Sequence, residues 1–296
     1  MSRVLVTGGN GMMGTDLCRI LRERGHAVTV TDKPEMDVRD PALVRRIVDG
    51  ARPDIVMHLA ALTDVDGCEQ APDDAYLTNT LGTQNVALAC LAQGADLLYV
   101  STLSVFNGDK GEPYTELDTP DPRSCYSRSK HQGELAVQRL VPRHYIVRAG
   151  WVFGGGTRDK KFVAKIIELA GQRPSLKIVD DKFGSPTYTV DISQGMVNLI
   201  ETKLYGTYHM VNTGPPASRY EVAREVLRCA GITSCELFPV SSDEFPLPAP
   251  RPRMEAGRNY QLDLRGLRWM RPWKDAIAEY VRDLVGPEPS RGRQVA

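Results

Sequence analysis

The feature of this sequence that most restricts its fold is a glycine-rich loop that joins a short apolar segment to a helical pattern. Residues 3–7 are largely apolar and β-branched, residues 8–14 are Gly-Gly-Asn-Gly-Met-Met-Gly, and residues 15–24 have helical periodicity. The glycines fit G-x-G-x-x-G from Gly9 and, equally well, G-x-x-G-x-x-G from Gly8. Such a loop lets the backbone approach a pyrophosphate, whose charge meets the free amides at the start of a helix. The alternative is an ordinary glycine-rich turn, and the next strand helps to distinguish the two.

A second strand, over residues 27–31, ends in Asp32 and supports the dinucleotide interpretation. An acid at this place is positioned to bind both hydroxyls of an adenosine ribose, and it repels a 2′-phosphate. Asp32 therefore favours NAD over NADP. Its neighbour Lys33 weakens that preference because a cation attracts the extra phosphate.

Strand and helix patterns then alternate along the first half of the chain. Five repeats of strand then helix require right-handed crossover connections and a parallel sheet with helices on both faces. We therefore predict an α/β fold in which residues 1–150 form a doubly wound Rossmann domain that binds a dinucleotide. The further predicted elements are strands at 54–61, 96–100 and 144–148 and helices at 41–50, 71–93 and after residue 125.

Beyond residue 150 the composition changes, and a smaller α/β lobe is expected. We predict that residues 151–286 form this substrate-binding lobe over the C-terminal edge of the sheet, with part of it returning to the sheet. Residues 287–296 are rich in Pro, Arg and Gly and predict a disordered tail. The elements expected in the lobe are helices at 161–170, 190–202 and 218–229, a strand at 205–211 and a proline-rich loop at 245–253.

Composition excludes several classes of partner. The formal net charge is zero, so nothing favours nucleic acid or an anionic membrane as a partner. No apolar run approaches the roughly 20 residues that cross a bilayer. The six cysteines show no metal-binding spacing with the histidines, so no metal is expected and the thiols are predicted to be reduced and packed. Without a recognisable leader at Met1, a cytoplasmic protein is expected.

A Tyr-x-x-x-Lys spacing points to chemistry at the sheet edge. Tyr126 and Lys130 lie four residues apart and so share one face of a helix, where the ammonium can favour ionisation of the phenol. Thr102 follows the strand at 96–100, at the edge where ligands bind in open α/β sheets. Separately, each has an ordinary alternative: a surface lysine beside a half-buried tyrosine, and a threonine that caps a turn.

Together with further motifs, these residues resemble the extended short-chain dehydrogenases/reductases, and among them the dTDP-4-dehydrorhamnose reductase family. The resemblance covers nearly the whole chain and is much more specific than any single motif. The matching segments are residues 7–14, 60–69, 79–85, 101–102, 105–108, 113–116, 126–130, 148–153, 183–187 and 251–252.

The resemblance implies a hydride transfer between a nicotinamide cofactor and C4 of a nucleotide-linked 4-keto-6-deoxyhexose. Tyr126 would give its proton to the carbonyl oxygen, and Thr102 would hydrogen-bond that oxygen. Lys130 would hold the nicotinamide ribose and lower the pKa of the tyrosine. Trp151 matches a position that touches the sugar, although it could also be a core tryptophan. Arg251 could meet the diphosphate or be a solvated loop charge.

The resemblance also implies which residues contact NAD(H) or NADP(H). They form the glycine loop, the ends of the first three strands and the catalytic helix. The predicted cofactor-binding residues are Gly8, Gly11, Met12, Met13, Gly14, Asp32, Lys33, Asp37, Val38, Leu59, Ala60, Ala61, Leu62, Asn79, Tyr126 and Lys130.

One position departs from the family pattern. Where the family usually has Ser-Thr-Asp-Tyr-Val-Phe, this chain has Leu103 and Ser104 after Thr102. Proton donation by Tyr126 does not need the missing acid, but the orientation or the identity of the sugar could differ. The loss also argues against a 4,6-dehydratase. That branch of the family has a Thr-Asp-Glu arrangement in which the two acids remove water from the sugar, and this chain has no acid at either place.

Three alternatives to a reductase that acts on the usual substrate of the family remain open. A sugar 4-epimerase also lacks the acid near Thr102 but shows no net consumption of cofactor. The family also resembles the non-catalytic regulatory subunit of methionine adenosyltransferase, which keeps this fold and binds NADP. Such a subunit would have no need for Tyr126 and Lys130. A reductase of an unusual, modified sugar would account for Leu103 and Ser104. The family includes metal-bridged dimers, which leaves a homodimer open, although this chain shows no acidic cluster near its C-terminus.

Overall fold

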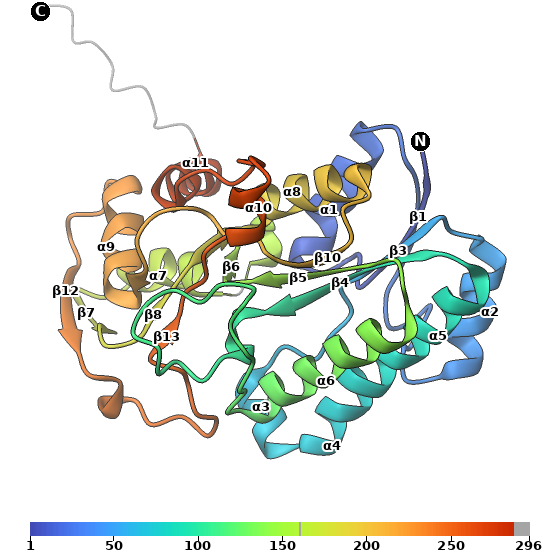
Figure 1. Ribbon diagram of the computed structural model, residues 1–296. Helices are drawn as coiled ribbons and strands as arrows, with labels where there is room; N and C mark the ends of the chain where they lie inside the picture. Colours follow the sequence, from blue (N-terminus) through green and yellow to red (C-terminus); the bar gives the residue numbers. More distant parts are fainter. Residues whose placement is uncertain (160, 287–296) are drawn as a thin grey trace, which may run out of the picture.

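A parallel sheet of six strands lies at the centre of the computed structural model, which describes residues 1–159 and 161–286 (Figure 1). Its order is β10-β5-β4-β3-β1-β2, and every neighbouring pair is parallel. The predicted doubly wound α/β fold is therefore confirmed. The strands are β1 (Arg3–Thr7), β2 (Ala27–Thr31), β3 (Ile55–His58), β4 (Asp96–Thr102), β5 (His144–Ala149) and β10 (Gly206–His209).

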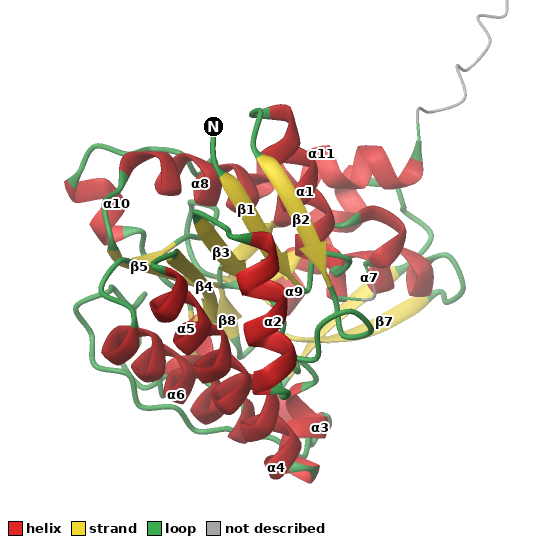
Figure 2. Ribbon diagram, turned by 90° about the vertical axis from the view of Figure 1, so that its right-hand side faces the viewer, coloured by secondary structure: helices red, strands yellow, loops and turns green. Residues whose placement is uncertain are grey.

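Helices cover both faces of this sheet (Figures 1 and 2). One face carries α1 (Met12–Glu23) and α8 (Thr189–Thr202), which pack against each other. The other face carries α2 (Pro41–Ala51), α5 (Gly82–Gln93) and α6 (Cys125–Leu140). Successive side chains of a strand point to opposite faces, so each strand contributes to two cores.

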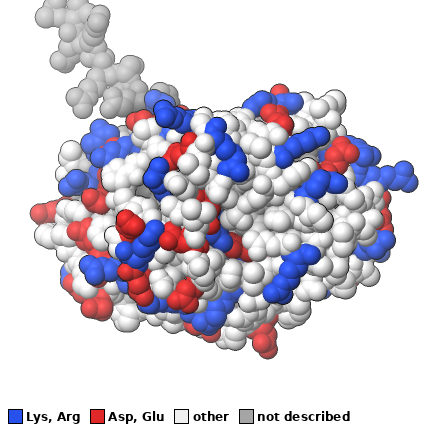
Figure 3. Space-filling model, viewed as in Figure 1, with Lys and Arg blue, Asp and Glu red and all other residues white. Residues whose placement is uncertain are grey.

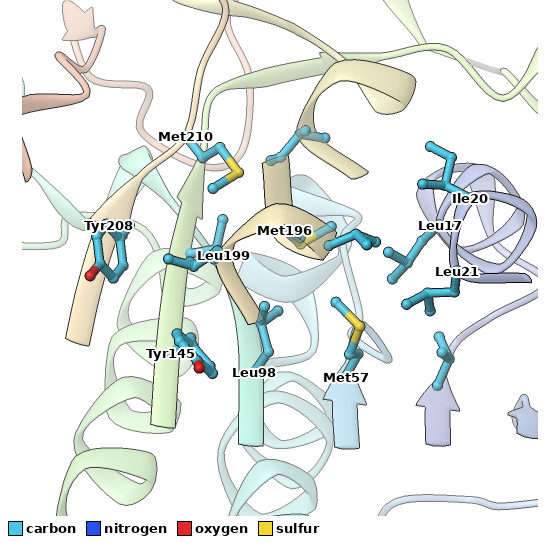
Figure 4. Packing of buried hydrophobic residues seen from close by; sticks show 14 of the residues in the cluster. Leu17, Ile20, Leu21, Met57, Leu98, Tyr145, Met196, Leu199, Tyr208 and Met210 are labelled. Carbon is cyan, nitrogen blue, oxygen red and sulfur yellow. The ribbon is translucent and has the colours of Figure 1, made fainter. Parts of the chain in front are cut away.

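The alternation is visible in β1, where Val4 and Val6 join the core under α1 and α8, whereas Leu5 joins the core on the opposite face. Figure 4 shows the first of these cores, with Leu17 of α1 and Met196 of α8 lying over the strands. Burial of such side chains contributes about 1.5–3 kcal/mol each. Both layers of helices are thereby held on one sheet, and the C-terminal strand edge is left free.

The helix predicted at 71–93 is present but not uniform. It consists of α4 (Pro72–Ala75), a π-helix at Tyr76–Leu81 and α5, and a short helix α3 (Val65–Gln70) precedes it. A π-turn accommodates one extra residue and shifts the side chains that follow it. Periodicity alone did not reveal this irregularity.

The second half of the chain is divided between the sheet and a separate layer. Strand β10 pairs with β5 and extends the large sheet, and α8 packs beside α1 on one of its faces, so residues 189–209 are part of the same layered unit as the first half of the chain. The remaining segments form a lobe with its own buried core. Its elements are β6 (Trp151–Phe153), α7 (Phe162–Ala170), β7 (Ser175–Val179), β8 (Phe183–Gly184), β9 (Pro186–Tyr188), β11 (Ala217–Ser218), α9 (Arg219–Cys229), β12 (Glu236–Val240), β13 (Met254–Glu255) and α11 (Trp273–Val285). Helix α10 (Tyr260–Leu264) instead packs against β10, and its Leu262 joins the core under α1 and α8.

Several of these elements were not expected from the sequence. Helix α11 buries Trp273, Ala276, Ile277 and Tyr280, which is the spacing of an amphipathic helix, so a signal was present. Strands β8, β11 and β13 are two residues long, too short for alternation to reveal. The predicted disordered tail at 287–296 lies outside the described residues.

On the face shown in Figure 3, Lys and Arg side chains are interspersed with Asp and Glu side chains. Over the described part of the chain, no helix is long and apolar enough to cross a membrane. Within the same residues, no group of His, Cys, Asp and Glu side chains is arranged to hold a metal ion. The cysteines are free thiols, and all but Cys229 are buried.

Candidate active site

A cleft of about 1020 Å³ follows the C-terminal edge of the sheet and continues beneath the lobe. One end is lined by the glycine loop and the end of β2, the middle by the end of β4 and the start of α6, and the other end by lobe residues. The cleft is lined by every predicted site residue except Asn79: Gly8, Gly11, Met12, Met13, Gly14, Asp32, Lys33, Asp37, Val38, Leu59, Ala60, Ala61, Leu62, Thr102, Tyr126, Lys130, Trp151 and Arg251.

The glycine loop is built to hold a phosphate. Helix α1 begins directly after Gly11, and no side chain caps its first amides, which therefore point free into the cleft. Gly8 has a φ of +66°, and a Cβ at Gly14 would lie 2.4 Å from the carbonyl oxygen of Gly8. Only glycines allow these two turns to pack so closely. The loop thus fits the pyrophosphate of a dinucleotide.

The end of the cleft beside the glycine loop contains two acids and two cations. Asp32 accepts hydrogen bonds from the backbone amides of Asn10 at 3.3 Å and Lys33 at 2.8 Å. Asp37 is held by the guanidinium of Arg39, whose Nη2 lies 2.6 Å from Oδ2, and this bond lowers the pKa of Asp37 to about 2. Arg39 also lines the cleft. Arg39 was not among the predicted residues, although Asp37 and Val38 directly before it were, because the contacts that the resemblance implied in this segment ended at Val38.

Asn79, predicted to contact the cofactor, is fully buried and does not line the cleft. Its amide nitrogen donates to the carbonyl oxygen of Leu62 at 3.0 Å, and its amide oxygen accepts from the Leu62 backbone amide at 2.8 Å. It also donates to Ser129 Oγ at 3.0 Å. Both amide hydrogens of Asn79 are thus donated within the protein, and the side chain holds Leu62, in the loop after β3, beside the cleft.

The middle of the cleft brings together Thr102, Tyr126 and Lys130. Thr102 is the last residue of β4, and Tyr126 lies in the first turn of α6, which Ser124 caps. Thr102 Oγ1 lies 2.9 Å from Ser104 Oγ and accepts from the Ser104 amide at 3.2 Å. Lys130 Nζ donates to the carbonyl oxygen of Val100 at 2.7 Å. Ser104, a second hydroxyl in the cleft, was not predicted as a site residue.

The electrostatics of Tyr126 differ from the expectation. Burial and the negative charge of Glu255 raise the pKa of the phenol, and a hydrogen bond with Thr102 offsets only part of the effect. Burial also lowers the pKa of Lys130 to about 7, while Glu134 favours its charged form. In the protein by itself, the phenol is therefore held in its protonated form, as a proton donor requires.

A buried ion pair lies one helical turn beyond Lys130. Glu134 accepts from Arg148 of β5 at 2.9 and 2.7 Å, and His131 Nδ1 lies 3.3 Å from the same carboxylate. These interactions lower the pKa of Glu134 to about 2. The pair fastens α6 to β5 and supplies a fixed negative charge behind Lys130.

The lobe end of the cleft is formed by side chains from distant segments. The guanidinium of Arg219, the first residue of α9, lies 3.6 Å from the ring centre of Trp151. Burial lowers the pKa of Arg219 to about 10, and no hydrogen bond from its side chain is found among the described residues. Arg251 instead donates to Asp66 at 2.8 Å and to the carbonyl oxygen of Ala249 at 2.9 Å.

Glu255 of β13 also lines this end and accepts a hydrogen bond from Trp151 Nε1 at 2.9 Å. Sequence reasoning missed both Arg219 and Glu255, because each comes to the cleft through pairing of very short strands. Leu103, which stands where the family has an acid, is fully buried with Phe106, Tyr114 and Val211.

Solved structures share this fold over nearly its whole length. A dTDP-4-dehydrorhamnose reductase from Clostridium acetobutylicum matches with a TM-score of 0.92 at 37% identity, covering 95% of this chain and 99% of the other. A dTDP-4-dehydrorhamnose reductase from Bacillus anthracis, in complex with NADP, matches with a TM-score of 0.91 at 36% identity and covers the same shares of the two chains. The UDP-glucose 4-epimerase of Thermus thermophilus, in complex with NAD, matches with a TM-score of 0.82 at 27% identity, covering 96% of this chain and 99% of the other. Fold and cleft thus define the class, that of the NAD(P)-dependent oxidoreductases.

Sequence comparison narrows this class to a family. Residues 2–285 match the model of the RmlD substrate binding domain. The dTDP-4-dehydrorhamnose reductase of Mycobacterium tuberculosis is 38% identical over 281 residues, covering 93% of this chain and 91% of the relative. SpsK, a spore coat polysaccharide biosynthesis protein of Bacillus subtilis, is 35% identical over 283 residues, covering 96% and 98%. The chain belongs to the dTDP-4-dehydrorhamnose reductase family, as its motifs predicted.

Proposed function

We propose that this chain uses NADH or NADPH to reduce the C4 keto group of a nucleotide-linked 4-keto-6-deoxyhexose. The observation that carries the proposal is the position of Thr102, Tyr126 and Lys130 in the middle of one cleft. On one side lies a loop that fits a dinucleotide, and on the other lie an arginine and a tryptophan suited to a nucleotide sugar.

Each residue has a defined part in this reaction. The bound nicotinamide supplies the hydride. Tyr126 donates the phenolic proton to the carbonyl oxygen, which becomes the new hydroxyl group. Thr102 hydrogen-bonds the same oxygen and stabilises the charge that develops on it. Lys130 binds the nicotinamide ribose and, when protonated, stabilises the phenolate that remains on Tyr126.

The adenosine end favours NAD(H), in our proposal, because Asp32 lies where a ribose 2′-phosphate would be placed. Lys33 and Arg39 reduce this preference, since both line the same end. Arg39 is already bound to Asp37, so its charge is only partly available to a phosphate. A moderate preference for NADH, with measurable use of NADPH, is expected.

Arg219 is a better candidate than Arg251 for the diphosphate of the sugar nucleotide. The charge of Arg251 is engaged by Asp66, whereas Arg219 stacks on Trp151 with its donors unused by the described residues. A planar guanidinium binds phosphate oxygens in pairs and loses little freedom when it is already stacked. Arg251 instead fastens the proline-rich loop to α3.

The test is to follow oxidation of NADH and of NADPH with dTDP-4-keto-6-deoxyglucose and with its 3,5-epimerised form. Oxidation that depends on the sugar supports the reductase. If neither keto-sugar is reduced but UDP-glucose, which carries a C4 hydroxyl, is converted to its C4 epimer without net oxidation, a 4-epimerase would replace the reductase. Bound cofactor with neither reaction, together with a retained protein partner, would favour a regulatory subunit.

A further inference from the structure

Glu255 occupies a position in the cleft that the geometry of two short strands creates. Strand β13 pairs with β8 so that Glu255 lies beside Gly184. A Cβ at Gly184 would lie 2.3 Å from the indole of Trp151, so the indole fills the space that the glycine leaves. From there, Trp151 Nε1 donates to Glu255 Oε2 at 2.9 Å. The carboxylate is therefore held at a fixed place in the cleft wall.

This carboxylate has unused hydrogen-bonding capacity. Among the described residues, the bond from Trp151 is the one hydrogen bond that the Glu255 side chain accepts, and no ion pair to Arg219 or Arg251 is formed. A carboxylate offers about four acceptor positions, and burial of its charge is costly without partners. Burial accordingly raises the pKa of Glu255. The side chain is arranged to receive further donors from the cleft.

The position is close to the reacting group. Glu255 and Tyr126 line the same cleft, and the charge of Glu255 is the largest influence on the pKa of the Tyr126 phenol after burial. The β4 end cannot supply an acid here, because Leu103 points into a buried apolar cluster and Ser104 carries only a hydroxyl. Of the acids that line the cleft among the described residues, Asp32 and Asp37 lie at the end with the glycine loop, which leaves Glu255 of β13 as the acid at the lobe end.

We propose that Glu255 is a substrate-binding residue that accepts a hydrogen bond from a sugar hydroxyl near the reacting carbonyl, with Trp151 holding the carboxylate in place. The inference rests on the proposed function, since it names which side chain recognises the sugar. An ionised carboxylate only accepts hydrogen bonds, so it selects a ligand that presents a donor. Ring hydroxyls of a deoxyhexose are such donors.

The experiment compares Glu255→Gln with wild type by calorimetric titration of dTDP and of dTDP-rhamnose, the reduced sugar nucleotide, onto the enzyme saturated with NAD. Glutamine keeps the size and can still accept from Trp151, but it loses the charge. Affinity for dTDP-rhamnose should fall about tenfold to a hundredfold, whereas affinity for dTDP should change less than about twofold. The affinity of Glu255→Asp for dTDP-rhamnose should lie between that of Glu255→Gln and that of wild type. The control is Glu244→Gln, an exposed acid that pairs with Lys177.

Two results overturn the inference. Equal affinity of wild type and Glu255→Gln for dTDP-rhamnose would show that the carboxylate does not contact the sugar. Equal losses for dTDP and dTDP-rhamnose would assign Glu255 a structural role. The titrations do not depend on turnover, so failure of the proposed function can be recognised separately. It would appear as a wild-type protein that binds dTDP-rhamnose but does not oxidise NADH or NADPH when the keto-sugars are added.

Discussion

The two ends of the cleft are built in different ways. The end proposed for the dinucleotide is formed mainly by the backbone of a loop within residues 8–14, together with the ends of β2 and β3. The end proposed for the sugar is formed by side chains of distant segments: Trp151 and Glu255 share a hydrogen bond although they are 104 residues apart. The shape of the first end depends on the backbone conformation of one loop. The shape of the second end depends on which side chains the tertiary structure brings together.

This difference explains how one fold can serve several sugars. Backbone amides bind phosphate irrespective of most side chains, so the cofactor end has little reason to vary with the substrate. Side chains such as Arg219 and Glu255 can change without altering the sheet, because they lie in a lobe with its own core. Substrate choice is therefore expected to depend on the lobe. Variants that affect one end only can test this separation.

The largest effect is expected at the junction of the two ends. Tyr126→Phe should lower kcat by about a hundredfold to ten-thousandfold, because the proton donor is lost. Binding of NADH and of the sugar nucleotide should stay close to wild type in titrations, since neither end is altered. Tyr260→Phe, on α10 and outside the cleft, is the control. A Tyr126→Phe enzyme with near-normal kcat would contradict the assignment.

A whole-molecule effect should follow from Glu134→Gln, which leaves Arg148 without its buried partner. The free energy of unfolding should fall by about 3–5 kcal/mol, as measured by urea denaturation. Glu201→Gln, in an exposed pair with Arg24, should cost less than about 1 kcal/mol.

The pH dependence of stability tests the same pair. Because the pKa of Glu134 is lowered from 4.5 to about 2, its contribution to stability should be complete above pH 4.5 and disappear as the pH falls towards 2. In Glu134→Gln, this part of the acid destabilisation should be missing. Identical acid profiles for wild type and variant would show that the pair does not contribute.

A matched pair of glycine variants can separate the two ends directly. Gly14→Ala places a Cβ 2.4 Å from the Gly8 carbonyl oxygen, and Gly184→Ala places one 2.3 Å from the Trp151 indole. Each clash should cost about 1–3 kcal/mol locally. Gly14→Ala should weaken NADH binding and leave sugar-nucleotide binding unchanged, and Gly184→Ala should do the reverse.

The control for both is Gly50→Ala in α2, where a Cβ meets no atom within 4 Å. It should leave both affinities unchanged and should not destabilise the protein. If Gly184→Ala weakened NADH binding as strongly as binding of the sugar nucleotide, the two ends would not be independent.

The smallest effect concerns cofactor choice. Asp32→Asn removes the charge that repels a 2′-phosphate, and the ratio of kcat/KM for NADPH to that for NADH should rise by about fivefold, as one exposed charge interaction suggests. Asp49→Asn, in an exposed pair with Arg45, should leave the ratio unchanged. A fall in the ratio after Asp32→Asn would place the adenosine ribose elsewhere.

Much of the sheet and one end of the site could be predicted because their signals are local. Residues 3–32 contain a strand, the glycine loop, a helix and the acid within one continuous segment. The same holds for Tyr126 and Lys130, whose spacing by itself places them on one helix face. The placement of Asn79 could not be predicted for the opposite reason: its buried amide hydrogen-bonds Leu62, and a sequence does not show which way a polar side chain turns.

The sequence by itself determined the doubly wound sheet, the position of the glycine loop and the helix that carries Tyr126 and Lys130, because apolar periodicity and turn residues act over a few neighbouring positions. Only the tertiary structure decided that Leu103 turns away from the cleft while Arg219 and Glu255 enter it. These placements depend on the pairing of β8, β11 and β13, whose two-residue strands carry almost no pattern of their own. Their pairing is stabilised by the packing of the whole lobe, which no single segment of the sequence contains.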